Sequence, residues 1–380
     1  MAGREVSPPR SVRADVGGTD DDEPVPALPS DPPELATSPA LPSARPPALG
    51  EWGLDVVDEL LVVGGLDPDA AVWQVRDRSG DEWAVKATRR DCRFGLALAA
   101  ALGPDSGVVA PLPTRADDHW AERDGLLVSV SPWVLGDDAA EEGRGLDLDQ
   151  WAELGAVVRR VHDQPPPSSV APLRQGVKRT GRRARVRLRD LDARFVGAGQ
   201  APGVDPELAE LWHVHRDRLR RLETTALQLK EARGATARVS CHGDPHLGNV
   251  VVDPAGRPWL IDLDEATVAP REVDLVLVEL GVLPGLPVEP GHRSAFRRGY
   301  GDDVRLDDDR VTRFGCVRAL EDVTAVFAAL EGAHSPQHSG DLVGVRAGLD
   351  ALLGPSGLVS LVEERLSRSS PPTGRPRRDT

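Results

Sequence analysis

The most informative stretch of this chain is Cys241-His-Gly-Asp-Pro-His-Leu-Gly-Asn249, followed by Ile261-Asp-Leu-Asp264. Its two parts supply three aspartates and one asparagine. Carboxylate and amide oxygens are the ligands that Mg²⁺ prefers in proteins. The glycines and the proline of the first part predict a loop, not a helix or a continued strand. The stretch therefore predicts a cation site, provided that the chain folds back between its two parts.

The residues between these two parts predict a β-hairpin. Apolar runs at residues 250–252 and 258–261 flank the sequence Asp253-Pro-Ala-Gly256, in which proline and glycine favour a tight turn. We place the centre of this turn between Ala255 and Gly256.

This turn position predicts which side chains meet. Asn249 then lies opposite Asp262, and opposite residues of an antiparallel pair are about 5 Å apart. Asp264 lies two residues further on the same side, so Asp244, Asn249, Asp262 and Asp264 converge. Asp244 is left to accept a proton from a substrate hydroxyl.

The rest of the chain changes in character near residue 136. Before it, the apolar runs at 60–63, 71–75, 82–87 and 126–130 predict short strands, with a hairpin turn at residues 79–81. After it, apolar residues recur every three or four positions and predict helices over 148–161, from 205 onward and over 311–330. The first of these begins after a cap at Asp147 or Asp149. A β-rich lobe followed by a larger helical lobe is an α+β plan.

Composition predicts the ends of the chain and excludes some functions. We expect a disordered Pro/Ala-rich tail over 1–50, an amino-terminal nucleotide-binding lobe over 51–135, a helical catalytic and substrate lobe over 136–366, and a disordered basic tail over 367–380. The net charge of −15 argues against nucleic acid as a partner. No signal sequence or membrane span is apparent, and the three cysteines form no CxxC pair, so we expect a cytoplasmic protein without a disulfide framework.

His242-Gly-Asp-x-x-x-x-Asn249 with Ile261-Asp-x-Asp264 resembles the catalytic and metal-binding segments of the aminoglycoside phosphotransferase and choline kinase superfamily. These proteins are relatives of the protein kinases, which carry arginine where Gly243 stands. The resemblance implies a two-lobe protein-kinase-like fold that uses ATP and Mg²⁺. It also implies that Asp244 is the catalytic base, that Asn249 and Asp262 hold the metal, and that Asp264 supports them.

Three further segments resemble the spectinomycin-phosphotransferase-like branch of this superfamily. They are residues 151–162, 269–275 and 296–301. The implied activity is transfer of the γ-phosphoryl group of ATP to a hydroxyl of a small molecule, aminoglycoside-like, aminocyclitol-like or a related metabolite.

The first lobe carries the residues that would contact nucleotide. Lys86 resembles the strand lysine that contacts the α- and β-phosphates, and it is one of only three lysines in this arginine-rich chain. Gly64 and Gly65 stand in the position of a glycine-rich loop, and Trp133 and Val134 resemble the hinge that holds adenine. The alternatives are a solvent-facing lysine, a plain turn and an ordinary linker.

One feature of the resemblance is missing. Kinase relatives pair the strand lysine with a helix glutamate, whereas here Asp91 is the only acid in the corresponding segment. Either Asp91 or a more distant acid positions Lys86. The missing glutamate leaves a catalytically weak ATP-binding regulator, a pseudokinase, as an alternative. A second alternative is a zinc hydrolase, because His242, Asp244 and His246 alternate as they would on one strand.

The charge of the substrate is left open by the sequence. A basic run would suit an anionic substrate or form a solvated helix face; it comprises Arg174, Lys178, Arg179, Arg182, Arg183, Arg185, Arg187, Arg189 and Arg194. Glu265 and Glu272 would instead suit substrate amines, although Glu272 and Asp274 could also brace the loop. We expect residues 170–235 and 285–310 to determine the substrate.

Overall fold

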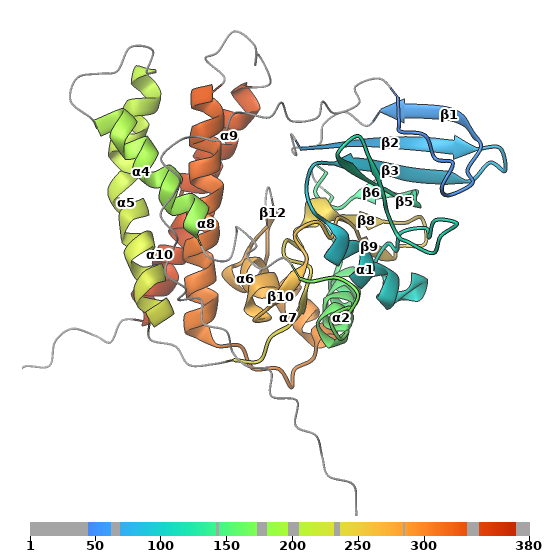
Figure 1. The fold of residues 1–380 in the computed structure, drawn as a ribbon. Coiled ribbons are helices and arrows are strands. Elements are labelled where there is room, and N and C mark those ends of the chain that lie inside the picture. Colours follow the sequence, from blue (N-terminus) through green and yellow to red (C-terminus); the bar gives the residue numbers. More distant parts are fainter. Residues whose placement is uncertain are drawn as a thin grey trace, which may run out of the picture. The chain divides into compact units, whose positions relative to one another are not determined.

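The structure, a computed structural model, describes residues 45–61, 69–141, 144–172, 181–196, 205–231, 236–283, 286–332 and 342–369. All of these belong to the unit Pro39–Thr380. A β-rich first part precedes a mainly helical second part, as predicted (Figure 1).

The first part is one five-stranded antiparallel sheet (Figure 1). Its strands, in spatial order, are β1 (Val56–Leu61), β2 (Ala70–Asp77), β3 (Glu82–Thr88), β5 (Leu126–Pro132) and β4 (Ala121–Arg123). The predicted hairpin joins β2 to β3, and Gly80 in its turn has φ +90°. Val85 and Ala87 are buried with the apolar side chains of β2 and β5. Because side chains alternate along a strand, Lys86 points to the opposite face of the sheet.

Helix α1 (Arg93–Leu102) lies between β3 and β4 in the chain and packs against the second part. Phe94 and Leu98 belong to the large core of the second part, not to the core of the sheet. A Cβ atom on Gly95 would lie 2.0 Å from the carbonyl oxygen of Leu263. Glycine therefore lets α1 pack directly onto the segment that carries Asp262 and Asp264.

The second part contains two small sheets that carry the sequence stretch described above. One comprises β6 (Asp137–Asp138), β8 (Val250–Val252) and β9 (Pro258–Leu260), and the other pairs β7 (Val239–Cys241) with β10 (Thr267–Ala269). A single 3₁₀ turn, Leu247–Asn249, precedes β8, and another, Pro104–Ser106, follows α1. Strands β11 (Val282–Leu283) and β12 (Leu286–Pro287) form a separate short ribbon.

The predicted hairpin over residues 250–261 is present, but the predicted register is wrong by one residue. Val250 pairs with Leu260, so Asn249 lies opposite Ile261 and not Asp262. The Asp253 carboxylate accepts hydrogen bonds from the backbone N–H groups of Ala255 and Arg257, both at 2.9 Å. These bonds move the centre of the turn onto Ala255.

Helices form most of the second part (Figure 1). They are α2 (Leu148–Asp163), α4 (Arg182–Val196), α5 (Pro206–Glu231), α6 (Glu272–Leu280), α7 (Pro290–Tyr300), α8 (Asp308–Gly332), α9 (Leu342–Leu353) and α10 (Leu358–Ser369). The three predicted helices correspond to α2, α5 and α8. Asp147 caps α2 in a capping box with Gln150, which decides between the two predicted caps.

Two glycines bring α2 and α7 into backbone contact. A Cβ atom on Gly155 would lie 2.1 Å from the carbonyl oxygen of Phe296, and one on Gly299 would lie 1.7 Å from that of Ala152. These residues lie in two of the segments that resemble the spectinomycin-phosphotransferase-like branch. Close packing of the two helices therefore explains why glycine stands at these positions of the two segments.

No helix in the described ranges is both long enough and apolar enough to cross a membrane.

Candidate functional site

Asp244 lies in a loop that leaves strand β7 through a glycine. Gly243 has φ +93°, and a Cβ atom there would lie 2.1 Å from the carbonyl oxygen of Glu265. Only glycine fits both this left-handed conformation and this close approach. The arginine of protein kinases has no room at this position.

The buried carboxylate of Asp274 on α6 holds this loop. It accepts hydrogen bonds from the backbone N–H groups of His242 (2.7 Å) and Gly243 (2.8 Å). It also lies 3.0 Å from Nε2 of His162, whose Nδ1 is 2.7 Å from the Tyr300 hydroxyl. Asp274 thus braces the loop of Asp244, the role considered for it from the sequence.

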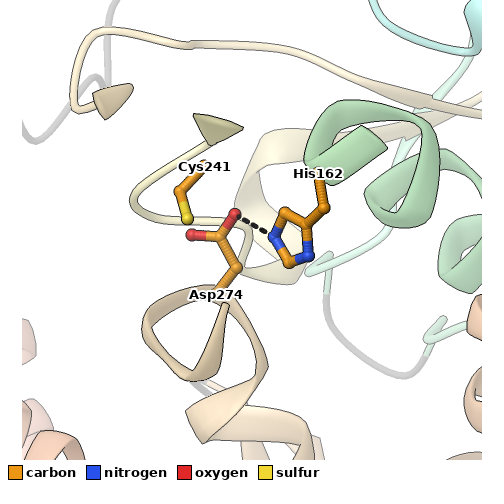
Figure 2. Close-up of side chains that lie close together, drawn as sticks. All are labelled: His162, Cys241 and Asp274. Carbon is orange, nitrogen blue, oxygen red and sulfur yellow. Dashed lines mark hydrogen bonds and ion pairs between the residues drawn. The ribbon is translucent and has the colours of Figure 1, made fainter. Parts of the chain in front are cut away.

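Figure 2 shows the group formed by His162, Cys241 and Asp274, whose potential ligand atoms lie within 4.8 Å of one another. Their polar atoms already have protein partners. Cys241 Sγ lies 3.6 Å from the carbonyl oxygens of Val239 and Ala269, and the Asp274 oxygens accept backbone N–H groups. A metal ion would have to displace these bonds, so we assign the group a structural role.

The side chain of His242 is also structural. Its Nε2 lies 2.9 Å from the carbonyl oxygen of Ile261, and its Nδ1 accepts a hydrogen bond from the Asp244 backbone N–H. His242 and Asp244 follow β7 and do not lie on it. The geometry that favoured a zinc hydrolase is therefore not formed.

Asn249 contacts the loop of Asp244, whereas Asp262 and Asp264 contact Lys86. Asn249 Nδ2 donates to the Asp244 carbonyl at 2.9 Å, which leaves the amide oxygen for a cation. Asp262 has φ +61°, a conformation that turns the chain away from β9. Lys86 Nζ lies 3.0 Å from Asp262 Oδ1 and 2.9 Å from Asp264 Oδ2.

Lys86, Asp262 and Asp264 shift one another's pKa values. Burial by itself lowers the pKa of Lys86, but the two carboxylates outweigh it and hold this pKa above its ordinary value. Burial, reinforced by the Asp262 carboxylate, raises the pKa of Asp264 to about 6 despite the opposing effect of Lys86. Burial opposes ionisation of Asp262 as well, but Lys86 holds its pKa below the ordinary value. The ammonium group thus occupies the position of a cation between two acids.

These contacts explain how Lys86 is positioned without a helix glutamate. Asp91 pairs with Arg93 at 2.7 Å, so the more distant acids Asp262 and Asp264 are the partners of Lys86. The missing glutamate therefore gives no reason to expect a loosely held lysine.

Of the other residues predicted to contact nucleotide, the structure describes Trp133 and Val134. Trp133 follows β5, and its backbone N–H donates to the carbonyl oxygen of Glu82 at 3.0 Å. That donor is used in the sheet, so adenine recognition by this segment would depend on Val134 and the backbone carbonyls. Gly64 and Gly65 lie outside the described residues.

Arg318 on α8 is a site residue that the sequence did not reveal. Its Nη1 lies 2.5 Å from Asp244 Oδ1, and its Nε lies 2.7 Å from Asp322 Oδ2. Asp244 and Arg318 are 74 residues apart, so no local pattern connects them. His162 and Tyr300 were also missed, although both lie in segments that carried the resemblance.

The two glutamates considered as partners for substrate amines have cations of their own. Glu265 pairs with Arg90 at 2.9 Å. Glu272 accepts the backbone N–H of Asp307 at 3.1 Å and lies 4.0 Å from Arg310.

The basic run is described only in part. Arg174, Lys178 and Arg179 lie outside the described residues. Arg187 on α4 lies 3.7 Å from Glu321 on α8.

Known proteins share the fold of this chain. Residues 64–308 match the model of the phosphotransferase enzyme family. The spectinomycin phosphotransferase complex with ADP and spectinomycin is similar with TM-score 0.70 and 19% identity, over 83% of this chain and 94% of that chain. The AMP-bound complex of that enzyme has TM-score 0.65 and 19% identity, over 82% and 95%. An amicoumacin kinase complex with AMP-PNP has TM-score 0.50 and 14% identity, over 81% and 88%. A search of curated proteins finds no match. At these identities the solved structures establish a shared fold.

Proposed function

Since this chain belongs to the phosphotransferase enzyme family, we propose that it transfers the γ-phosphoryl group of ATP to a hydroxyl group of a small molecule. The observation that carries the proposal is the contact of the strand lysine Lys86 with Asp262 and Asp264. The segment of these two aspartates also contacts the loop of Asp244, where Asn249 Nδ2 bonds the Asp244 carbonyl. Related solved structures bind ADP, AMP or AMP-PNP, which supports a nucleotide as the donor.

The donor set fits a magnesium ion. Asn249, Asp262 and Asp264 offer one amide oxygen and two carboxylates, which are the hard oxygen ligands of Mg²⁺. The contact of Lys86 with both aspartates supports this assignment, because a positive charge is already stabilised there. Bound Mg²⁺ would neutralise charge on the nucleotide phosphates. Lys86 is then free to contact those phosphates as a point charge.

Asp244 is assigned the role of base for the acceptor. Its loop is fixed by Asp274, and its carboxylate contacts Arg318, so the carboxylate is held before any substrate arrives. A carboxylate in hydrogen-bond reach of the acceptor hydroxyl orients it and accepts its proton. Because phosphoryl transfer depends mainly on positioning and charge stabilisation, this rigidity is functionally relevant.

A screen for acceptor-stimulated ATP consumption tests the proposal. Aminocyclitols, amino alcohols and hydroxylated metabolites would be added to protein with Mg·ATP, and ADP release would be measured. We expect stimulation by at least one acceptor in the wild type and loss of that stimulation in Asp262→Asn. Asp350→Asn, an exposed carboxylate on α9 that is 61% accessible, is the matched control and should behave as wild type. ATP binding without turnover for every acceptor would support the regulator instead.

A further inference from the structure

The guanidinium of Arg318 contacts the proposed base directly. It lies 2.5 Å from Asp244 Oδ1, and its side chain is only 11% exposed. Because of this contact, any acceptor that presents a hydroxyl to Asp244 meets this guanidinium. Arg318 lies beyond residues 64–308, the part of the chain that matches the family.

Arg318 is a fixed cation with donors to spare. Burial by itself lowers the pKa of Arg318, but Asp244 and Asp322 outweigh it and raise this pKa above its ordinary value. Arginine carries five N–H donors, and the bonds to Asp244 and Asp322 are made by Nη1 and Nε. Within the described part of the chain, Nη2 has no acceptor. Three N–H donors thus remain for oxygen atoms of a substrate, and two of them are on Nη2.

The acids near Asp244 already have cationic partners. Glu265 pairs with Arg90, and Asp322 shares Arg318 with Asp244. A substrate ammonium would have to displace one of these guanidinium groups before it gained a carboxylate. Arginine binds carboxylate and other oxygen groups well, whereas it repels a neighbouring ammonium.

We propose that Arg318 determines acceptor specificity: the hydroxyl that reacts at Asp244 is flanked by an oxygen group, as in a vicinal diol or a hydroxy acid, and not by an ammonium. This inference rests on the proposed phosphotransferase function. It names an acceptor class on which the sequence was undecided.

Binding of matched probes to the protein loaded with Mg·ADP tests this inference. Glycerol, glycerate and ethanolamine present the same kind of hydroxyl beside a hydroxyl, a carboxylate and an ammonium respectively. Affinities would be measured by calorimetry for the wild type, Arg318→Gln and Arg187→Gln. Arg187 is the matched control, because it contacts α8 at Glu321 and not at Asp244.

We expect the wild type and Arg187→Gln to bind glycerol or glycerate at least about tenfold more tightly than ethanolamine. Arg318→Gln should lose this preference, and Arg318→Lys should retain part of it. The two oxygen probes distinguish a neutral from an anionic acceptor. Equal binding of all three probes by the wild type, tighter binding of ethanolamine, or no binding of any probe would overturn the inference. Failure of Mg·ADP itself to bind would instead overturn the proposed function. The order of the three affinities in the wild type tests the proposed acceptor class even if Arg318→Gln does not fold.

Discussion

Replacing Asp274 with asparagine tests how Asp274 braces the loop of Asp244. Asp274 Oδ2 accepts the His242 backbone N–H and faces His162 Nε2, while Oδ1 accepts the Gly243 backbone N–H. Asparagine has the same shape but carries one NH₂ group in place of an oxygen. His162 can adapt by changing its tautomer, whereas a backbone N–H cannot become an acceptor.

One backbone N–H therefore loses its partner in either orientation of the new amide: the buried one of His242 or the partly buried one of Gly243. A buried donor without a partner costs about 1–3 kcal/mol, and the remaining bond loses the contribution of a charged acceptor. We expect Asp274→Asn to lower the free energy of unfolding by about 2–4 kcal/mol. Displacement of the loop by about 1 Å should also reduce phosphoryl transfer by about a hundredfold.

Urea unfolding, followed by both tryptophan fluorescence and far-ultraviolet circular dichroism, measures the loss of stability. Coincidence of the two transitions is required for a single free energy of unfolding. Asp303→Asn is the matched control, because it makes the same chemical change at a carboxylate that is 74% exposed. The reasoning is refuted if Asp274→Asn unfolds at the wild-type urea concentration and retains wild-type activity.

Three further predictions concern other parts of the structure. Gly299→Ala would place a Cβ atom 1.7 Å from the Ala152 carbonyl, so the helices must separate and the melting temperature should fall; an unchanged melting temperature contradicts the close contact. Burial raises the pKa of Tyr300, the only tyrosine, to about 12, whereas it is about 10 in an unfolded chain. Above about pH 10 the unfolded chain ionises first, so stability should fall by at most about 1.4 kcal/mol per pH unit up to about pH 12. Tyrosinate absorbance of the folded protein reads this directly, and half-ionisation near pH 10 would contradict it. Lys86→Met leaves Asp262 and Asp264 without a cation, so the melting temperature should fall in the absence of Mg²⁺ and recover when Mg²⁺ is added. A melting temperature of this variant that does not change with Mg²⁺ would argue against the metal site.

The arrangement of the site was predictable where it depends on local sequence. The hairpin over residues 250–261 follows from apolar runs around a proline- and glycine-containing turn. Its register did not follow, because the Asp253 carboxylate bonds the N–H groups of Ala255 and Arg257 and shifts the turn centre by half a residue. The positive φ of Asp262 was likewise not encoded in the alternation of the strand.

Contacts between distant segments were beyond the reach of sequence patterns. His162, Asp274 and Tyr300 lie in three separate segments that the resemblance identified without giving them a purpose. In the structure they contact one another, and Asp274 bonds the loop of Asp244. Arg318 reaches Asp244 across 74 residues, and one arginine among the many in this chain carries no distinguishing signal. Packing of α8 against the loop decides which arginine it is.

In the proposed reaction, Asp244 acts on the acceptor hydroxyl and not on the nucleotide. The most direct test compares Asp244→Asn with the wild type in two measurements, Mg·ATP affinity and appearance of phosphorylated acceptor. We predict an unchanged dissociation constant for Mg·ATP and a loss of product formation of at least about a hundredfold. Formation of phosphorylated acceptor by Asp244→Asn at the wild-type rate would contradict this role of Asp244.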